Sequence, residues 1–329
     1  MSRWMASRGR RDFLAASAAA VALGPGAALA QSAWPDRPVR FVVGFPPGGG
    51  VDVMARIVAQ PLSEVLGRQV VIDNKPGASS NVGMAEVARS APDGYSILIG
   101  PTTVETANPS LYKAPANPAT DLVPVVGIGR YQLHLIVRPG FPGRNVAELV
   151  AFAKANPGKL TYASAGAGTT PHLISELFLQ EAGIQALHVP YRGSAPALQA
   201  VMAGEADFVM DPGISFQHVR TGKVQMFGVA SAARSKQFPD VPTMAEAGVA
   251  GLDFDTWVGL WAPTGTPEEV RTRLSRAVGR VLAQADVQQK MAALNGEAVF
   301  LDTAEYRQLL GRETRVFSTL IRARKILAE

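Results

Sequence analysis

The chain has 329 residues, 47% of them hydrophobic, with 32 glycines, 24 prolines and no cysteine. The missing cysteine excludes disulfides, thiol nucleophiles and cysteine-ligated metal sites, and the length favours two domains over one. Residues 1–30 contribute +3 of the formal net charge of +5, leaving +2, and no basic run with interleaved aromatic residues remains, so a nucleic-acid partner is not expected.

The first 30 residues have the pattern of an export signal. Paired arginines, Arg10 and Arg11, precede an alanine-rich apolar run over 14–29, and Ala28-Leu29-Ala30 forms an A-x-A cleavage site. We therefore expect a signal peptide over 1–30, the twin-arginine route, cleavage after Ala30 and a periplasmic location. A membrane anchor is the alternative, but the apolar run is too short and 24–26 (GPG) interrupts it.

A strand over 39–45 is predicted to lead through a proline- and glycine-rich turn into a helix over 51–66. Such a turn presents free backbone N–H groups and the positive end of a helix dipole, which together bind anions. A plain strand-to-helix turn remains the alternative at this stretch. Neither G-x-x-x-x-G-K-[ST] nor G-x-G-x-x-G is present here.

The pattern then alternates, with strands over 69–73 and 95–100 and a helix over 81–89. Alternation of this kind predicts a parallel sheet with helices on both faces, whose ligands lie at the carboxyl ends of the strands. The loops 46–52, 74–81 and 101–105 meet that description. A turn-rich connection over 108–124 follows, before an apolar strand within 125–137.

The second half repeats this logic. After a helix capped by Asn145 with Glu148, a strand over 160–164 leaves through the small-residue turn 164–172, with Thr170 as N-cap and Pro171 at the first helical position. Two such turns are what a ligand held between two domains needs. One helix end contributes about 0.3 to 1 kcal/mol, up to ~2, whereas micromolar affinity needs roughly 8 kcal/mol, so several donors must act together.

The remaining elements are strands over 188–191, 207–210 and 223–230, the last a candidate return crossover, and a helix over 195–203. A strand over 257–262 is followed by a helix with Thr266 as N-cap and by a C-terminal helix over 303–327, whose broad apolar face is expected to pack inside the protein. The expected domains are 31–130 with 232–329 and, between them, 131–231.

Few residues suggest catalysis or metal binding. His134, His172, His188 and His218 are dispersed, so no metal and no cofactor are expected. Ser164 lies in a near match to the hydrolase elbow G-x-S-x-G, but Tyr162 replaces the first glycine. Asp52 can complement the helix dipole or pair with Arg56, and Asp211 can serve its turn or face a cleft.

Ordered motifs along the chain resemble the Bug family, the extracytoplasmic solute receptors of tripartite tricarboxylate transporters. They are 34–38 (WPDRP), 45–49 (FPPGG), 74–78 (NKPGA), 92–95 (PDGY), 162–168 (YASAGAG), 189–193 (VPYRG), 203–207 (AGEAD) and 239–243 (PDVPT). The resemblance implies two α/β domains of the flytrap type, each with a mainly parallel sheet and helices, joined by two crossover strands. It also implies a carboxylic acid ligand and a likeness to non-catalytic, monomeric receptors.

By this resemblance the loop 46–52 holds one carboxylate, partly through ordered water, the turn 164–170 forms the opposite wall, and Asp211 reaches the cleft. Gly50 and Val51 depart from the hydroxyl residues common in similar proteins, and Ser79 and Ser80 replace glycines. The expected ligand-binding residues are Phe45, Pro46, Pro47, Gly48, Gly49, Asp52, Ser79, Ser80, Thr102, Ser164, Gly166, Gly168, Thr169, Thr170, His172 and Asp211.

The primary hypothesis is thus a periplasmic binding protein that captures a small organic acid and presents it to transporter subunits in the membrane. Two rivals belong to other classes. One is an exported enzyme that uses the same cleft with Ser164 as nucleophile, and the other is an accessory protein of a membrane sensor. The sequence leaves open which acid is bound and which membrane partner receives it.

Overall fold

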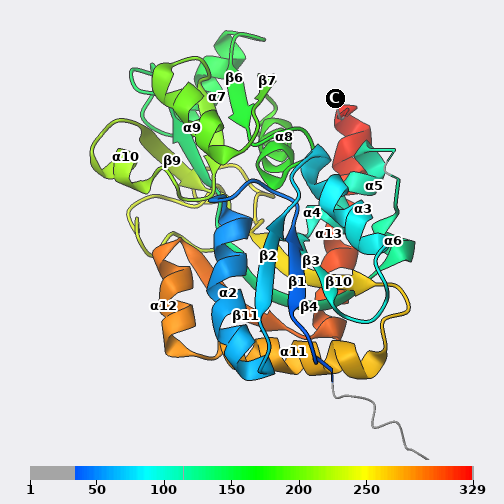
Figure 1. The fold of residues 1–329 in the computed structure, drawn as a ribbon. Helices are drawn as coiled ribbons and strands as arrows, with labels where there is room; N and C mark the ends of the chain where they lie inside the picture. Colours follow the sequence, from blue (N-terminus) through cyan, green and yellow to red (C-terminus); the bar gives the residue numbers. More distant parts are fainter. Residues whose placement is uncertain (1–33, 114, 328–329) are drawn as a thin grey trace, which may run out of the picture. The chain divides into compact units, whose positions relative to one another are not determined.

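Two β-sheets organise the part of the chain that this computed structural model describes, residues 34–113 and 115–327. From Arg37 onward the chain forms one compact unit. Within it, a six-stranded sheet has the order β11-β4-β10-β3-β1-β2 and a five-stranded sheet has the order β7-β6-β8-β5-β9. We call the two halves built on these sheets the large lobe and the small lobe (Figure 1).

The large sheet is mixed. The apolar strand β1 (Val39–Val43) pairs in parallel with β2 (Val70–Asn74) and β3 (Ser96–Pro101). Three further pairings, β10 (Thr256–Pro263) with β3, β10 with β4 (Leu122–Tyr131) and β11 (Gly296–Leu301) with β4, are antiparallel. The two-sheet α/β architecture is confirmed, but the expectation of a mainly parallel sheet is wrong here, because β4 leaves for the small lobe and β10 returns from it in the opposite direction.

The small sheet is mixed in the same way. Its parallel part joins β6 (Thr161–Ser164) to β7 (Leu187–Pro190) and to β8 (Phe208–Asp211). The strand β5 (His134–Val137) runs antiparallel to β8 and to β9 (Gln225–Val229). Thus β9, expected as the return crossover, belongs to the small sheet, and the chain returns to the large lobe only after it.

The chain passes between the sheets twice. The first passage is short, since β4 ends at Tyr131 and β5 begins at His134. The second uses the irregular segment between β9 and β10, residues 230–255. The predicted domain limits are close to these passages and remain a prediction.

Helices accompany both sheets (Figure 1). In the large lobe these are α2 (Gly50–Leu66), α3 (Asn81–Ala88), α11 (Glu268–Leu282), α12 (Ala285–Ala293) and α13 (Thr303–Arg324), and in the small lobe α7 (Val146–Ala155), α8 (Thr170–Ala182), α9 (Ser194–Ala203) and α10 (Phe216–Arg220). Single turns, η1 (Ala78–Ser80), α4 (Thr103–Thr106), α5 (Asn108–Leu111) and α6 (Pro118–Asp121), occur in the connections of the first half. The sequence patterns did not predict α12 and β11.

Two helix starts differ from the prediction by one residue. The N-cap of α8 is Thr169 rather than Thr170, and that of α11 is Pro267 rather than Thr266. In both cases a threonine hydroxyl donates to a carbonyl three residues earlier in the chain. Thr169 donates to Gly166 and Thr266 donates to Pro263, both at 2.7 Å. The capping prediction for Asn145 is confirmed, since its side chain accepts from the Glu148 amide at 2.9 Å.

The C-terminal helix α13 packs against both lobes. Tyr306 and Leu310 are buried with Trp261 in the large lobe. Further along the same helix, Phe317 and Leu320 belong to a hydrophobic core that also contains residues of the small lobe. Near its end, Arg324 Nε donates to Glu176 Oε2 of α8 at 2.8 Å. The prediction that this face packs inside the protein is confirmed.

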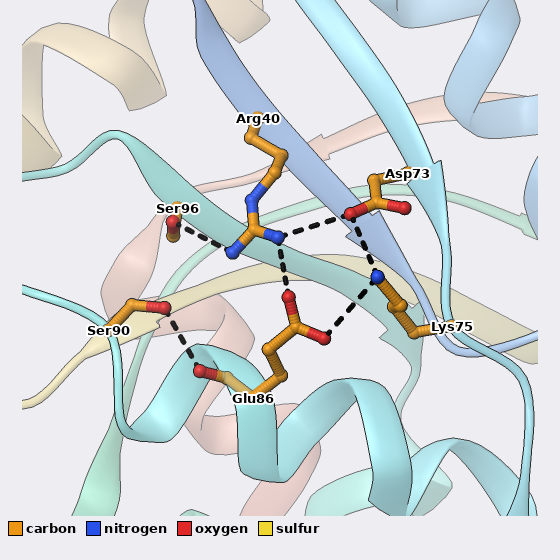
Figure 2. Close-up of polar contacts among 6 residues, drawn as sticks. All are labelled: Arg40, Asp73, Lys75, Glu86, Ser90 and Ser96. Atoms are coloured by element: carbon orange, nitrogen blue, oxygen red, sulfur yellow. Dashed lines mark hydrogen bonds and ion pairs between the residues drawn. The ribbon is translucent and has the colours of Figure 1, made fainter.

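A polar network connects β1 to its two neighbouring strands, β2 and β3, and to helix α3 (Figure 2). Arg40 of β1 forms ion pairs with Asp73 of β2, at 3.1 Å, and with Glu86 of α3. Lys75 lies 3.6 Å from Asp73, and Arg40 also donates to Ser96 of β3 at 3.3 Å. Exposed pairs contribute little singly, but this network links three strands and a helix near the start of β1.

Candidate ligand-binding site

A cavity of about 340 Å³ lies where the loops of the two lobes meet. This volume is within the range of roughly 300 to 1,000 Å³ that is typical of small-molecule sites. The lining combines the β1–α2 loop with the starts of α8 and α9. It consists of Phe45, Pro46, Pro47, Gly48, Gly49, Gly50, Val51, Pro101, Tyr131, Ala165, Thr169, Thr170, Pro171, Arg192, Gly193, Ser194, Ala195, Pro196, Pro212 and Ile214.

The β1–α2 loop forms the wall of the large lobe. Gly48 has φ 82°, a left-handed conformation that favours glycine, and Gly49 is the N-cap of α2 without any side-chain cap. The first amides of a helix have no partner within it. The N–H groups at the start of α2 are therefore available to a ligand in the cavity.

The buried side chain of Asp52 stabilises this loop through hydrogen bonds. Its carboxylate accepts from the Gly48 amide at 2.9 Å, from Arg56 Nε at 2.9 Å and from Asn74 Nδ2 at 2.8 Å. Burial raises the pKa of Asp52, but the hydrogen bonds from Arg56, Gly48 and Asn74 outweigh burial and hold that pKa below its usual value. The carboxylate thus stays ionised and fixes the turn.

The start of α8 forms the first part of the small-lobe wall, and a set of local hydrogen bonds shapes the turn before it. Ser164 Oγ accepts from the Gly166 amide at 3.1 Å, and His172 Nδ1 accepts from the Gly168 amide at 3.0 Å. The hydroxyl of Thr169, the N-cap, donates to the Gly166 carbonyl and does not cap the helix. The first amides of α8 therefore also lack a side-chain partner.

Two stacked histidines lie behind this turn. The rings of His172 and His188 have centroids 3.9 Å apart at 7° between planes, and Tyr162 stacks on His188 at 4.8 Å. Burial lowers the pKa of His172 to about 3, with His188 adding to the effect, and burial lowers the pKa of His188 to about 4. Both rings are neutral near pH 7, so they support the turn without adding charge.

The start of α9 completes the small-lobe wall. Gly193 is its N-cap with φ 115°, and no side chain caps the helix. The loop before it is tied to the α8 turn, because the Tyr191 amide donates to the Ser164 carbonyl at 3.0 Å and the Gly193 amide donates to the Ala165 carbonyl at 3.2 Å. This holds the exposed Arg192 at the cavity lining.

Asp211 accepts a backbone amide of a cavity turn in the small lobe, as Asp52 does in the large lobe. Its Oδ2 accepts from the Gly213 amide at 2.7 Å and from the Ser215 hydroxyl at 2.8 Å, whereas its buried Oδ1 has no hydrogen-bond partner among the described residues. Unlike the pKa of Asp52, the pKa of Asp211 is raised by burial, and the bonds from Ser215 and Gly213 only oppose the rise. The turn that it holds carries Pro212 and Ile214, which line the cavity.

Three uncapped helix N-termini and Arg192 therefore meet at a cavity whose other lining residues are mostly apolar. Three helix ends at up to ~2 kcal/mol each, with a charge-assisted hydrogen bond of about 1.5 to 3 kcal/mol, reach the scale of micromolar binding, roughly 8 kcal/mol. The arrangement suits a small anion that is largely withdrawn from water.

The expected ligand-binding residues fall into two groups. Seven line the cavity: Phe45, Pro46, Pro47, Gly48, Gly49, Thr169 and Thr170. The others lie outside its lining, where they support the loops or are buried elsewhere: Asp52, Ser79, Ser80, Thr102, Ser164, Gly166, Gly168, His172 and Asp211. Their roles toward a ligand remain predictions.

Ser80 and Thr102 show why loops at the carboxyl ends of strands need not face a cavity. Ser80 is fully buried against Gly44, where an added Cβ would lie 1.7 Å from the Ser80 Oγ. Thr102 is buried beside α13 and hydrogen-bonds Glu313. Both residues pack inside the large lobe.

The residues that the sequence interpretation left out come mainly from the start of α9: Arg192, Gly193, Ser194, Ala195 and Pro196. The signal was present, since 188–194 again runs from a strand through a glycine into a helix. Tyr131 and Pro101 come from strand ends and had no such signal.

Residues 34–113 and 115–327 contain no helix long and apolar enough to cross a membrane, and no group of three or more histidine, aspartate and glutamate side chains placed to hold a metal ion. The predicted signal peptide over 1–30 lies outside the described residues.

Comparison with known proteins agrees with this architecture. Residues 54–326 match the model of the tripartite tricarboxylate transporter family receptor. A protein of Pseudomonas sp. (strain P51), described as the UPF0065 protein in the tcbD-tcbE intergenic region, is 40% identical over 292 residues, which cover 88% of this chain and 87% of that protein.

Two solved structures are similar over most of the chain. The periplasmic binding protein BugD is 34% identical with a TM-score of 0.81, covering 90% of this chain and 100% of the other. Rpa4515 of R. palustris, solved with adipate, is 32% identical with a TM-score of 0.84 and the same coverage. The chain therefore belongs to the Bug-type receptor family of tripartite tricarboxylate transporters.

Proposed function

We propose that this protein is a periplasmic solute-binding receptor that captures a small organic acid between its lobes and delivers it to a tripartite tricarboxylate-type transporter. The observation that carries the proposal is the meeting of three uncapped helix N-termini with Arg192 at one cavity. The adipate held by the related Rpa4515 supports a carboxylate as the ligand. Export by the signal over 1–30 and a monomeric state belong to the same proposal.

The site is proposed to be non-catalytic. Ser164 Oγ lies 2.7 Å from His188 Nε2, a distance that a nucleophile and its base can have. However, Ser164 is fully buried and does not line the cavity, and its hydroxyl is engaged by the Gly166 backbone. Replacing Ser164 with Ala should change ligand affinity only modestly, and no compound of the panel below should be turned over.

A variant at the β1–α2 loop tests the binding site. Gly49 has ordinary dihedral angles, φ −74° and ψ 162°, and an added Cβ would meet only the Pro46 carbonyl at 3.5 Å. Gly49→Leu should therefore fold normally while filling the space in front of the α2 amides. We expect calorimetry to show affinity for the bound acid weakened by at least about tenfold, a loss of about 1.4 kcal/mol.

Gly311→Ala, on α13 and away from the cavity lining, is the matched control and should bind like the wild type. The ligand panel contains mono-, di- and tricarboxylates, aromatic acids and neutral compounds, screened first by thermal shift. Binding of neutral compounds only, or unchanged affinity in Gly49→Leu, would contradict the proposal. Loss of uptake of the bound acid on gene deletion would support delivery, whereas intact uptake together with capture of a sensor ectodomain would favour the sensing rival.

A further inference from the structure

A hydrogen bond joins the two lobes beside the start of α8. Tyr112 directly follows α5 in the large lobe, and its hydroxyl donates to the Ala167 carbonyl at 2.7 Å. Ala167 belongs to the turn between β6 and α8 in the small lobe. This bond is separate from the two connections, 132–133 and 230–255, through which the chain passes between the sheets. Tyr112 therefore ties a turn of one lobe to the body of the other.

Close packing accompanies this bond. Gly168 has φ 74°, and a Cβ added there would lie 2.8 Å from Leu111 Cδ1 and 3.2 Å from Tyr112 Cε2. Leu111 in turn packs against the hydrophobic core that contains Leu173 of α8 and Phe317 of α13. The backbone of the turn therefore rests on two side chains of the large lobe as well as accepting a hydrogen bond from it.

Other residues of the same turn line the cavity, namely Ala165, Thr169 and Thr170. The bond from the Gly168 amide to His172 fixes the turn to α8, within the small lobe. The bond from Tyr112 instead fixes it to the large lobe, which carries the β1–α2 loop on the opposite wall. The position of one cavity wall relative to the other therefore depends on Tyr112.

Helix α8 is attached to the large lobe at a second point further along its length. Glu176 accepts from Arg324 of α13 at 2.8 Å, and it lies about 9 Å beyond Thr170 along the helix axis. A single contact would leave α8 free to swing about it, whereas two contacts at different heights fix its direction. The Tyr112 bond is the one at the cavity end of the helix.

Building on the proposed function, we propose that Tyr112 is a positioning residue for ligand binding. Its hydroxyl and ring hold the β6–α8 turn in place before the acid arrives, so that the free amides at the start of α8 face the same ligand as those of α2. Tyr112 itself is not one of the described residues that line the cavity. Its contribution is preorganisation, which reduces the ordering entropy that binding costs.

The test compares the variant Tyr112→Phe with the wild type. The variant loses the hydroxyl but keeps the ring that packs on Gly168, so it should fold normally. We expect calorimetry to show that the tightest-binding acid of the panel above binds about fivefold more weakly, as the loss of one neutral hydrogen bond predicts.

Hydrogen exchange of the ligand-free protein shows whether the turn itself is affected. In Tyr112→Phe the peptide covering 165–173 should exchange about fivefold faster than in the wild type, because the turn opens more often without its bond to the large lobe. The peptide covering 190–197, at the start of α9, should exchange at the same rate in both proteins.

Tyr95→Phe is the matched control. Tyr95 directly precedes β3, and the other end of that strand, Pro101, lines the cavity. The control therefore removes a tyrosine hydroxyl from the large lobe at the end of the strand that is remote from the ligand. It should match the wild type both in affinity and in exchange of the peptide 165–173.

The outcomes separate this inference from the proposed function. Wild-type affinity in Tyr112→Phe would overturn the inference, even with faster exchange of the turn, because the bond would then be purely structural. Equal weakening in Tyr112→Phe and Tyr95→Phe would also overturn it, and both results would leave a carboxylate receptor. Binding of none of the acids by the wild type would overturn the proposed function and this inference with it.

Discussion

Several buried ionisable side chains in this protein hold its loops in place through hydrogen bonds. Asp52 and Asp211 each accept backbone amides of a turn whose other residues line the cavity. His172 accepts the Gly168 amide in the turn before α8. At the scale of single residues, the polar groups that the sequence marks as binding residues act largely by holding backbone donors in place.

The buried Glu313 of α13 allows the effect of burial on the pH dependence of stability to be tested. Burial raises its pKa to about 7, against the opposing hydrogen bond from Thr102, and among the described residues its Oε2 has no hydrogen-bond partner. A raised pKa means that the folded state keeps a proton that the unfolded state releases, so this residue's contribution to stability is present below about pH 4.5 and is lost as the pH rises to about 7. The loss is roughly 3 kcal/mol.

Glu313→Gln should remove this dependence. Urea unfolding at several pH values is expected to show the variant gaining stability relative to the wild type as the pH rises from about 5 to about 8. The comparison must be a difference, because the buried histidines act in the opposite sense: their lowered pKa values cost stability as the pH falls below about 6.5. Glu64→Gln, an exposed control, should show a constant difference, and the same result for Glu313→Gln would contradict the prediction.

At the scale of elements, the starts of α2, α8 and α9 share one design: a glycine or threonine N-cap that leaves the first amides uncapped. Each follows a parallel strand, so all three point their positive ends to the same edge of their sheet. The short helix η1 follows another parallel strand, β2, yet it packs against Gly44 and stays outside the cavity.

The helix η1 carries backbone strain that can be measured. Ala78, Ser79 and Ser80 have φ values of 46°, 51° and 76°, a left-handed run without glycine. Left-handed conformations cost non-glycine residues about 1 to 2 kcal/mol each. Ser79→Gly should therefore stabilise the protein by about 1 kcal/mol, detectable as a higher Tm.

Ser79→Ala is the matched control, since it removes a buried hydroxyl that has no partner within the described part of the chain but keeps the strained backbone. A similar gain in both variants would assign the effect to the hydroxyl instead of the backbone conformation.

At the scale of the whole molecule, the cavity has walls from both lobes, while α13 packs against both lobes and reaches α8 through the Arg324 to Glu176 ion pair. Two connections join the sheets, at 132–133 and 230–255. We expect this combination to let the lobes move apart on the cavity side while α13 keeps contact with α8.

We expect the lobes to close when the acid binds, because helix ends of both lobes must reach one ligand. Small-angle scattering should show a smaller radius of gyration at saturating ligand, and Gly49→Leu at the same ligand concentration should keep the unliganded value. Identical scattering with and without ligand in the wild type would show that the cavity is preformed.

The order of strands and helices could be predicted from the amino-acid sequence over most of the chain, because apolar periodicity and the glycine and proline turns are local signals. The sequence also indicated the family and two of the three helix starts at the cavity. The observed N-caps of α8 and α11 differ from the predicted ones by one residue, where the Thr169 and Thr266 hydroxyls donate to preceding carbonyls. The strand β11 escaped prediction because its burial depends on pairing with β4.

The direction of the strands, the loop residues that face the cavity and the ionisable groups that are buried became known only from the folded structure. Antiparallel pairing of β10 follows from the return of the chain from the small lobe, which local patterns do not encode. Asp52 and Ser80 follow the same strand edge as Gly49, yet packing turns them away from the cavity and brings Arg192 and Tyr131 to it. The physical reason is that orientation and burial arise from contacts between segments far apart in the chain.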